Sequence, residues 1–139
     1  MPDFLVLGFD FGLRHIGVAV GQSVTGTARP LPSLVARAGV PNWHQIEQLC
    51  AEWQPQILMV GMPLSEAGSE HGITKLAKHF ANQLRDKLQL PVHLVDERYT
   101  TLEAKRDLSQ LGKRRVQKTQ IDGWAAKIIT EAGLRELSQ

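Results

Sequence analysis

Two apolar runs with different spacing open the chain. Residues 4–9 are almost all apolar, which is typical of a strand buried on both faces, and the run ends at Asp10. Residues 16–21 then alternate large aliphatic side chains with glycine and alanine, which is the period of two expected of a strand. We therefore expect a hairpin, with Gly12 in its turn, where a positive φ costs glycine little.

Asp10 is an acid at the C-terminal end of a strand that is predicted to be buried. An unpaired buried carboxylate is costly, so its position needs an explanation. One explanation is that Asp10 handles a metal ion or a proton. The other is that it starts a turn by bonding its own backbone, and this stretch alone does not choose between them.

Strands and helices alternate along the remaining chain. Pro30 and Pro32 cannot donate ladder hydrogen bonds, so a third strand around residues 25–35 is expected at an edge of the sheet. Apolar spacing predicts these further elements: a helix at 43–53, a strand at 57–60, a helix at 73–88, a strand at 92–95, a helix at 100–111, and a final helix opening around Ile121 with Ile121, Ala125, Ile128 and Ala132 on one face.

This order predicts an α/β fold. Three consecutive strands form an antiparallel meander, later strands join it in parallel to give a mixed five-stranded sheet, and helices cover both faces. The 139 residues fit a single domain, 1–139, without internal repeats or linkers.

No apolar run is long enough to cross a membrane, and the start of the sequence has no secretory pattern. A single cysteine, Cys50, on the apolar stripe of its helix, favours a reducing compartment, the cytoplasm.

Acids stand at the ends of three predicted elements. Asp10 ends the first strand, Asp96 and Glu97 end the last, and Asp122 is expected in the first turn of the final helix, where the dipole favours its ionised form. The C-terminal ends of parallel strands meet at one edge of a sheet. Adjacent strand residues point apart, so only one of Asp96 and Glu97 faces such a site, and we prefer Glu97.

Grouped carboxylates repel one another unless a cation compensates. Oxygen ligands suit Mg²⁺ or Mn²⁺, and two such ions about 3.5–4 Å apart are the usual arrangement for phosphodiester hydrolysis. The alternatives are that Asp122 is a helix N-terminal acid and that Glu97 pairs with a neighbouring cation such as Arg98. The five histidines show no metal-ligand spacing and are expected to be solvated or structural.

Positive charge is concentrated before the last helix, although the net charge of the chain is only +2. Such a run is either a solvated face or a contact to a phosphate backbone. Six of the sixteen Lys and Arg residues lie there: Lys105, Arg106, Lys113, Arg114, Arg115 and Lys118.

Four motifs together resemble those of the YqgF family. They are residues 10–19 (DFGLRHIGVA), residues 61–64 (GMPL), residues 96–104 (DERYTTLEA), and Lys118 followed by Ile121-Asp122 and Ala125-Ala126. Members of this family are described as nucleases of the 16S rRNA precursor, and formerly as Holliday junction resolvases. The resemblance covers essentially the whole chain and implies an RNase H-like fold.

The resemblance also implies roles for individual residues. Asp10, Glu97 and Asp122 would be the catalytic acids that bind Mg²⁺ or Mn²⁺. Arg14, Arg98 and Thr101 would lie beside the substrate phosphates. The other residues expected to contact nucleic acid are Gly12 and, from the basic run, Arg114, Arg115 and Lys118. Gly123 departs from the family, which often has Ser there, so no hydroxyl can act at that position.

The expected function is that of a metal-dependent endonuclease acting on structured nucleic acid, processing the 5′ end of the 16S rRNA precursor. One alternative is a Holliday junction resolvase acting on branched DNA as a symmetric dimer. A non-catalytic nucleic-acid-binding module is another, which intact acids disfavour. A kinase-like ATP-binding half would need a second such domain. We expect a monomer or weak homodimer in the cytoplasm, with no membrane partner.

Overall fold

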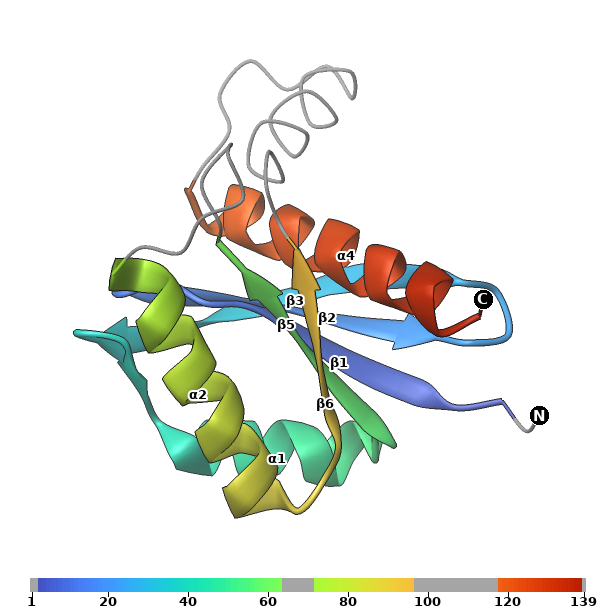
Figure 1. Ribbon diagram of the computed structural model, residues 1–139, viewed down its shortest axis with the longest axis horizontal. Helices are drawn as coiled ribbons and strands as arrows, with labels where there is room; N and C mark the ends of the chain where they lie inside the picture. The colour runs from blue at the N-terminus through green and yellow to red at the C-terminus, as the bar shows by residue number, and fades with distance from the viewer. Residues whose placement is uncertain (1–2, 64–71, 97–117, 139) are drawn as a thin grey trace.

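The computed structural model describes residues 3–63, 72–96 and 118–138, with side chains of the last segment from Asp122 onward. These residues form a six-stranded sheet, ordered β4-β3-β2-β1-β5-β6, and three helices (Figure 1). The elements are β1 (Leu5–Asp10), β2 (His15–Gln22), β3 (Thr27–Arg37), β4 (Val40–Pro41), α1 (Trp43–Trp53), β5 (Ile57–Met62), α2 (Gly72–Leu88), β6 (Val92–Asp96) and α4 (Lys118–Leu137).

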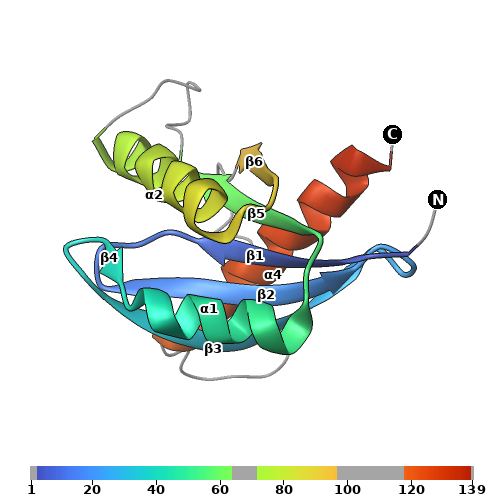
Figure 2. The same cartoon turned by 90° about the horizontal axis from the view of Figure 1, so that it is seen from below.

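The sheet is mixed, as the sequence predicts. Strands β1, β2 and β3 form an antiparallel meander, and β5 and β6 join β1 in parallel. Helices α1 and α2 cover one face and α4 covers the other (Figure 2). The predicted α/β architecture is confirmed, with one addition: β4 is a sixth strand of two residues, too short to show a period of two in the sequence.

The face of the sheet under α1 and α2 is filled by large side chains. Phe80 of α2 lies at its centre, with ring centroids 5.8 Å from Phe9, 5.4 Å from Phe11 and 5.8 Å from Trp43. Such aromatic pairs contribute about 0.5–1.5 kcal/mol each beyond the area they bury. Cys50 of α1 is half-buried beside this core, as its place on the apolar stripe predicts, and burial raises the pKa of its thiol.

The opposite face is lined by small residues, and α4 packs directly on it. A Cβ added to Gly8 would meet the Thr130 side chain, and one added to Gly21 would lie 2.7 Å from Thr130 Cγ2. On the helix side, a Cβ on Gly133 would strike Met59. The helix α4 and the sheet therefore approach more closely than larger side chains would allow. Because β2 alternates large and small residues, its small side packs against α4 and its large side packs under α1 and α2.

Two sequence predictions about α4 need correction. The helix begins at Lys118, before the expected Ile121, because its first turn is polar and carries no apolar spacing. The buried stripe is also rotated, so that Ile129 is buried while the predicted Ile128 is only half-buried. The full buried stripe is Gly123, Ala125, Ala126, Ile129, Thr130, Gly133 and Leu134.

The prediction that Gly12 uses a positive φ is wrong. Among the described glycines, only Gly26 and Gly39 have φ in that region. Glycine is required at position 12 for a steric reason, because an added Cβ would strike the carbonyl oxygen of His15.

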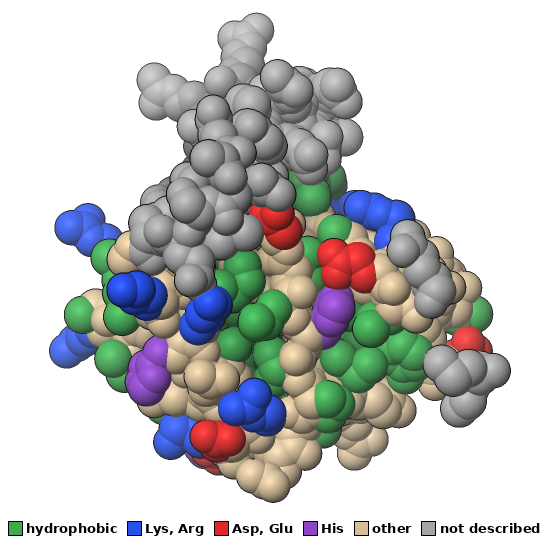
Figure 3. Space-filling model, in the orientation of Figure 1, with side chains coloured by type: hydrophobic (Ala, Val, Ile, Leu, Met, Phe, Trp, Pro, Cys, Tyr) green, Lys and Arg blue, Asp and Glu red, His purple; other side chains and the backbone are tan. Residues whose placement is uncertain are grey.

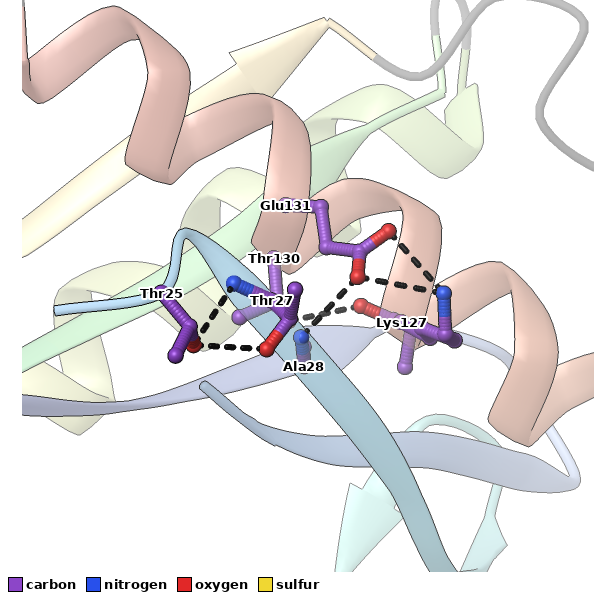
Figure 4. Close-up of polar contacts among 7 residues, drawn as sticks. Thr25, Thr27, Ala28, Lys127, Thr130 and Glu131 are labelled. Atoms are coloured by element: carbon purple, nitrogen blue, oxygen red, sulfur yellow. Dashed lines mark hydrogen bonds and ion pairs between the residues drawn. The ribbon is translucent and has the colours of Figure 1, made fainter. Parts of the chain in front are cut away.

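The outer edge of β3 is blocked in the way that its prolines predict. Pro30 and Pro32 carry no N–H. The Ala28 N–H donates to Glu131 Oε2 of α4 over 3.0 Å, and Lys127 Nζ donates to the same carboxylate (Figure 4). Another strand would find few free donors there.

The predicted helix at 100–111 lies outside the described residues. None of the described helices is long and apolar enough to cross a membrane.

Replacing Gly8 by alanine tests the contact between α4 and the sheet. We expect Gly8→Ala to lower the free energy of unfolding by about 1–3 kcal/mol in urea titrations, because the methyl group meets Thr130. Adding Thr130→Ala should restore part of this loss. Gly72→Ala is the matched control, since nothing lies within 4 Å of its new Cβ. Equal stability of Gly8→Ala and Gly72→Ala would contradict the close packing.

Candidate active site

Asp10 is placed by the hairpin at the C-terminal end of β1. Its Cα pairs with that of Gly17 in the antiparallel register. Residues directly opposite in such a pair point to the same face, with Cβ atoms about 4.5–5.5 Å apart. A Cβ on Gly17 would point at α4, so the half-buried Asp10 side chain also lies on the α4 face.

Asp122 lies directly over the partner of Asp10. A Cβ built on Gly17 would strike the carbonyl oxygen of Asp122 and lie 2.6 Å from its carbonyl carbon and 3.2 Å from its Cβ. No side chain larger than hydrogen fits between β2 and this turn of α4. The absence of a side chain at Gly17 thus brings two acids, from residues 112 positions apart in the chain, to the same end of one face.

The prediction that Asp122 lies in the first turn of its helix is wrong. Because α4 begins at Lys118, Asp122 is the fifth helical residue, and the first turn contains no acid. The dipole acts mainly within that first turn, so it explains little of this acid's position. The interpretation of Asp122 as a helix N-terminal acid loses its basis for the same reason. What fixes Asp122 is the contact of its backbone with Gly17.

Asp96 lies on the other face of the sheet. It pairs with Met62 in the parallel register, whereas its neighbour Val95 pairs with Gly61 and packs in the cluster under α4. Asp96 is exposed on the side of α1 and α2, away from the Asp10 face. The choice of Glu97 over Asp96 as the acid of the site stays a prediction. Glu97, the preferred acid, lies outside the described residues.

The other predicted contact residues are described only in part. Gly12 and the exposed Arg14 lie in the connection between β1 and β2, at the same end of the sheet as Asp10. The Arg14 carbonyl accepts a hydrogen bond from the Ala36 N–H over 2.8 Å, which ties this connection to β3. Lys118 is the first residue of α4. Arg98, Thr101, Arg114 and Arg115 lie outside the described residues.

His15 also belongs to this end of the sheet, although the sequence pattern does not single it out. It is the first residue of β2, two before Gly17, so alternation places its side chain on the Asp10 face. Its Nδ1 is buried and has no hydrogen-bond partner in the described part of the chain. The sequence does carry one signal for it: His15 stands two residues before Gly17, on the side of the strand that carries glycine and alanine.

The donor set fits a hard divalent cation. Mg²⁺ is commonly held by one or two carboxylates, with water and substrate phosphate completing its shell. Asp10 and Asp122 supply two carboxylates on one face, and an Oδ atom of Asp122 is buried. No group of three His, Cys, Asp or Glu side chains within residues 3–63, 72–96 and 122–138 could hold a metal ion.

Comparison with known proteins identifies the family. Residues 5–136 match the family described as "RuvX: Holliday junction resolvase". This chain belongs to the RuvX family. A relative from Glaesserella parasuis, named "Putative pre-16S rRNA nuclease", is 47% identical over 134 residues, covering 96% of this chain and 97% of that protein. One of the same name from Actinobacillus pleuropneumoniae is 48% identical over 128 residues, covering 91% and 93%. The resemblance predicted from the motifs is confirmed.

Solved resolvase structures share the fold of this RuvX chain. Thermus thermophilus RuvC in complex with a Holliday junction substrate superposes with a TM-score of 0.56 at 15% identity, covering 96% of each chain. The Fowlpox virus resolvase in complex with junction DNA gives 0.57 at 10% identity, covering 96% of this chain and 97% of that one. These matches confirm the RNase H-like fold, and RuvX membership supports a nuclease acting on nucleic acid.

Gly17→Ala tests whether this glycine places Asp122. The added methyl meets backbone atoms, which cannot rotate aside, so the start of α4 has to lift from the sheet. We expect a larger loss of unfolding free energy than in Gly8→Ala, and faster hydrogen–deuterium exchange of amides 122–126. Gly72→Ala should change neither. Unchanged exchange in Gly17→Ala would show that Asp122 is held by something else.

Proposed function

We propose that this protein is a metal-dependent endonuclease that acts on structured nucleic acid and processes the 5′ end of the 16S rRNA precursor. The observation that supports it best is the placement of Asp10 and Asp122 together over Gly17, at the strand ends of an RNase H-like sheet. Relatives named for pre-16S rRNA support the choice of substrate. Processing of this precursor would take place in the cytoplasm.

In this proposal each residue of the site has a defined task. Asp10 and Asp122 hold divalent ions, Mg²⁺ or Mn²⁺, and Glu97 is the third acid, since Asp96 faces away. The chemistry that such ions would supply there is activation of water for attack on the phosphodiester and stabilisation of the leaving oxygen. Arg14, exposed at the same end, binds a substrate phosphate. The five remaining basic and hydroxyl positions extend this contact: Arg98, Thr101, Arg114, Arg115 and Lys118.

A Holliday junction resolvase is the second candidate. It is favoured by the description of the family and by the fold shared with resolvases in junction complexes. The same two acids would serve either reaction, because both cut a phosphodiester. The two functions differ in substrate and in assembly, since resolution of a junction requires two sites acting on two strands.

The cleavage test compares Asp10→Asn with wild type on two substrates: an RNA spanning the mature 5′ end of 16S rRNA, and a four-way DNA junction. We expect wild type with Mg²⁺ or Mn²⁺ to cut the RNA, and Asp10→Asn to cut neither. The melting temperature of Asp10→Asn should be equal or higher, because removing one neighbouring acid relieves repulsion. Asp3→Asn, an exposed acid near the N-terminus, is the control and should cut normally.

The outcomes separate the candidates. Cleavage of the junction by a dimeric wild-type protein, with the RNA left intact, would favour the resolvase. Failure of wild type to cut either substrate, with binding retained, would favour a non-catalytic module. Full activity of Asp10→Asn would remove Asp10 from the site.

Thermal melting against added Mn²⁺ tests the choice between Asp96 and Glu97. At a hundred times the dissociation constant, bound metal should stabilise the wild-type fold by about 2.7 kcal/mol. Glu97→Gln should lose much of this response, because an amide is a neutral and poorer ligand for a hard cation. Asp96→Asn should keep it, because Asp96 lies on the opposite face. The reverse pattern would exchange the two roles, and two unaffected variants would exclude a ligand from this strand.

A further inference from the structure

Positive charge among the described helices is concentrated on α2. This helix carries four Lys and Arg residues against one Asp, a net charge of +3, whereas the whole chain has +2. Neighbouring α1 has two Glu and no Lys or Arg, and α4 carries three charges of each sign. Figure 3 shows Lys and Arg side chains gathered over α2. The two helices on one face of the sheet therefore have opposite charge.

The charges on α2 form a line on one flank of the helix. The buried residues Ala77, Phe80 and Leu84 turn one side to the sheet, which leaves Lys75, Lys78 and Arg85 exposed at i, i+3 and i+10. We call these three residues the α2 basic stripe.

The fourth cation of α2 lies on the opposite flank. Lys87 Nζ is 5.2 Å from the ring centroid of Trp43 in α1. The α2 basic stripe therefore faces away from the acidic α1. The acid beside Arg85 is Asp86, 76% exposed and 3.7 Å from Arg85 Nε, and Asn82 accepts a hydrogen bond from Arg85. Exposed contacts of this kind are weak, so a phosphate group can replace them.

The stripe begins at the end of the sheet that carries the acids. The Thr74 hydroxyl donates to the Pro63 carbonyl over 2.8 Å, which ties the first turn of α2 to the residue after β5. Strand β5 runs parallel to β1, so this is the same end of the sheet as Asp10. From Lys75 to Arg85 the stripe extends roughly 15 Å along the helix, the axial length of about four nucleotides of one strand.

We propose that the α2 basic stripe binds the phosphate backbone of the substrate nucleic acid outside the cleavage site. This inference rests on the proposed nuclease function. Lysine and arginine spaced along a line suit a polyanion of regular charge, and the acidic α1 repels such a ligand from the other flank. A second copy docking through this face would bring like charges together. The stripe therefore strengthens binding irrespective of base sequence, because phosphate contacts carry no direct sequence information.

The experiment measures binding of wild type, Lys75→Gln/Arg85→Gln and Arg135→Gln to one RNA hairpin of fixed sequence, without divalent metal, at salt from about 50 to 200 mM. Arg135 is the matched control for Arg85, since each is an exposed arginine in the last turn of its helix. We expect the double variant to bind roughly tenfold or more weakly and its plot of log K against log salt to flatten by roughly two units, one per lost contact. Arg135→Gln should match wild type.

The outcomes distinguish the stripe from the proposed function itself. If wild type binds with a steep salt dependence and the double variant has the same slope, the stripe is a solvated face and this inference is overturned while the nuclease proposal stands. If wild type does not bind RNA or branched DNA at any salt concentration, both fall. If Lys75→Gln/Arg85→Gln instead changes the oligomeric state, measured by light scattering, the face is a protein interface and the inference is wrong. Circular dichroism of the variants confirms that these exposed substitutions leave the fold intact.

Discussion

The contact of α4 with the sheet is the constraint on which the rest of the structure depends. Gly8, Gly17 and Gly21 leave no room for a Cβ beneath the helix, and Gly133 leaves none above Met59. A helix that lies this close to the sheet has one position on it, because shifting it by a residue would drive side chains into the strands. The close packing of α4 on the sheet therefore fixes the position of Asp122 relative to Asp10. A site that must hold two carboxylates at defined separation gains from such rigid supports.

The two faces of the sheet differ in composition: one holds the larger hydrophobic core, and the other carries the glycines and the acids. Aromatic and aliphatic side chains under α1 and α2 form the larger of the two main cores, built around Phe9 and Phe80. Beneath α4 the core is smaller, built around Met59, Val95 and Ile129. Burial of apolar area on the first face supplies most of the hydrophobic stabilisation. The second face can then place glycine, and acids at its end, where bulkier residues would displace the helix.

Most of the architecture could be predicted from local pattern, and the site only in part. The period of two at Ile16, Val18 and Val20 predicts the hairpin, and Asp10 at its end follows from the same run. The start of α4 could not be predicted, because Lys118 to Gln120 have no apolar spacing. The reason for the position of Asp122 is a contact with Gly17, more than a hundred residues away, and local periodicity carries no information about such contacts. Strand alternation predicts that Asp96 and Glu97 point apart, and the register places Asp96 on the face away from Asp10.

The rigid packing of α4 on the sheet also affects the interaction between the carboxylates of Asp10 and Asp122. Asp10 and Asp122 have neighbouring positions across Gly17, and the backbone of Asp122 rests on β2, so the carboxylates cannot move apart by shifting the helix. In the proposed site, a bound cation would therefore offset the repulsion between neighbouring carboxylates without structural relaxation. A softer scaffold would lower this repulsion by opening, and would lose affinity for a cation in proportion. The same missing Cβ that closes the packing would thus hold the acids of the proposed site together for a cation, so a purely steric feature of β2 would bear on the chemistry of that site.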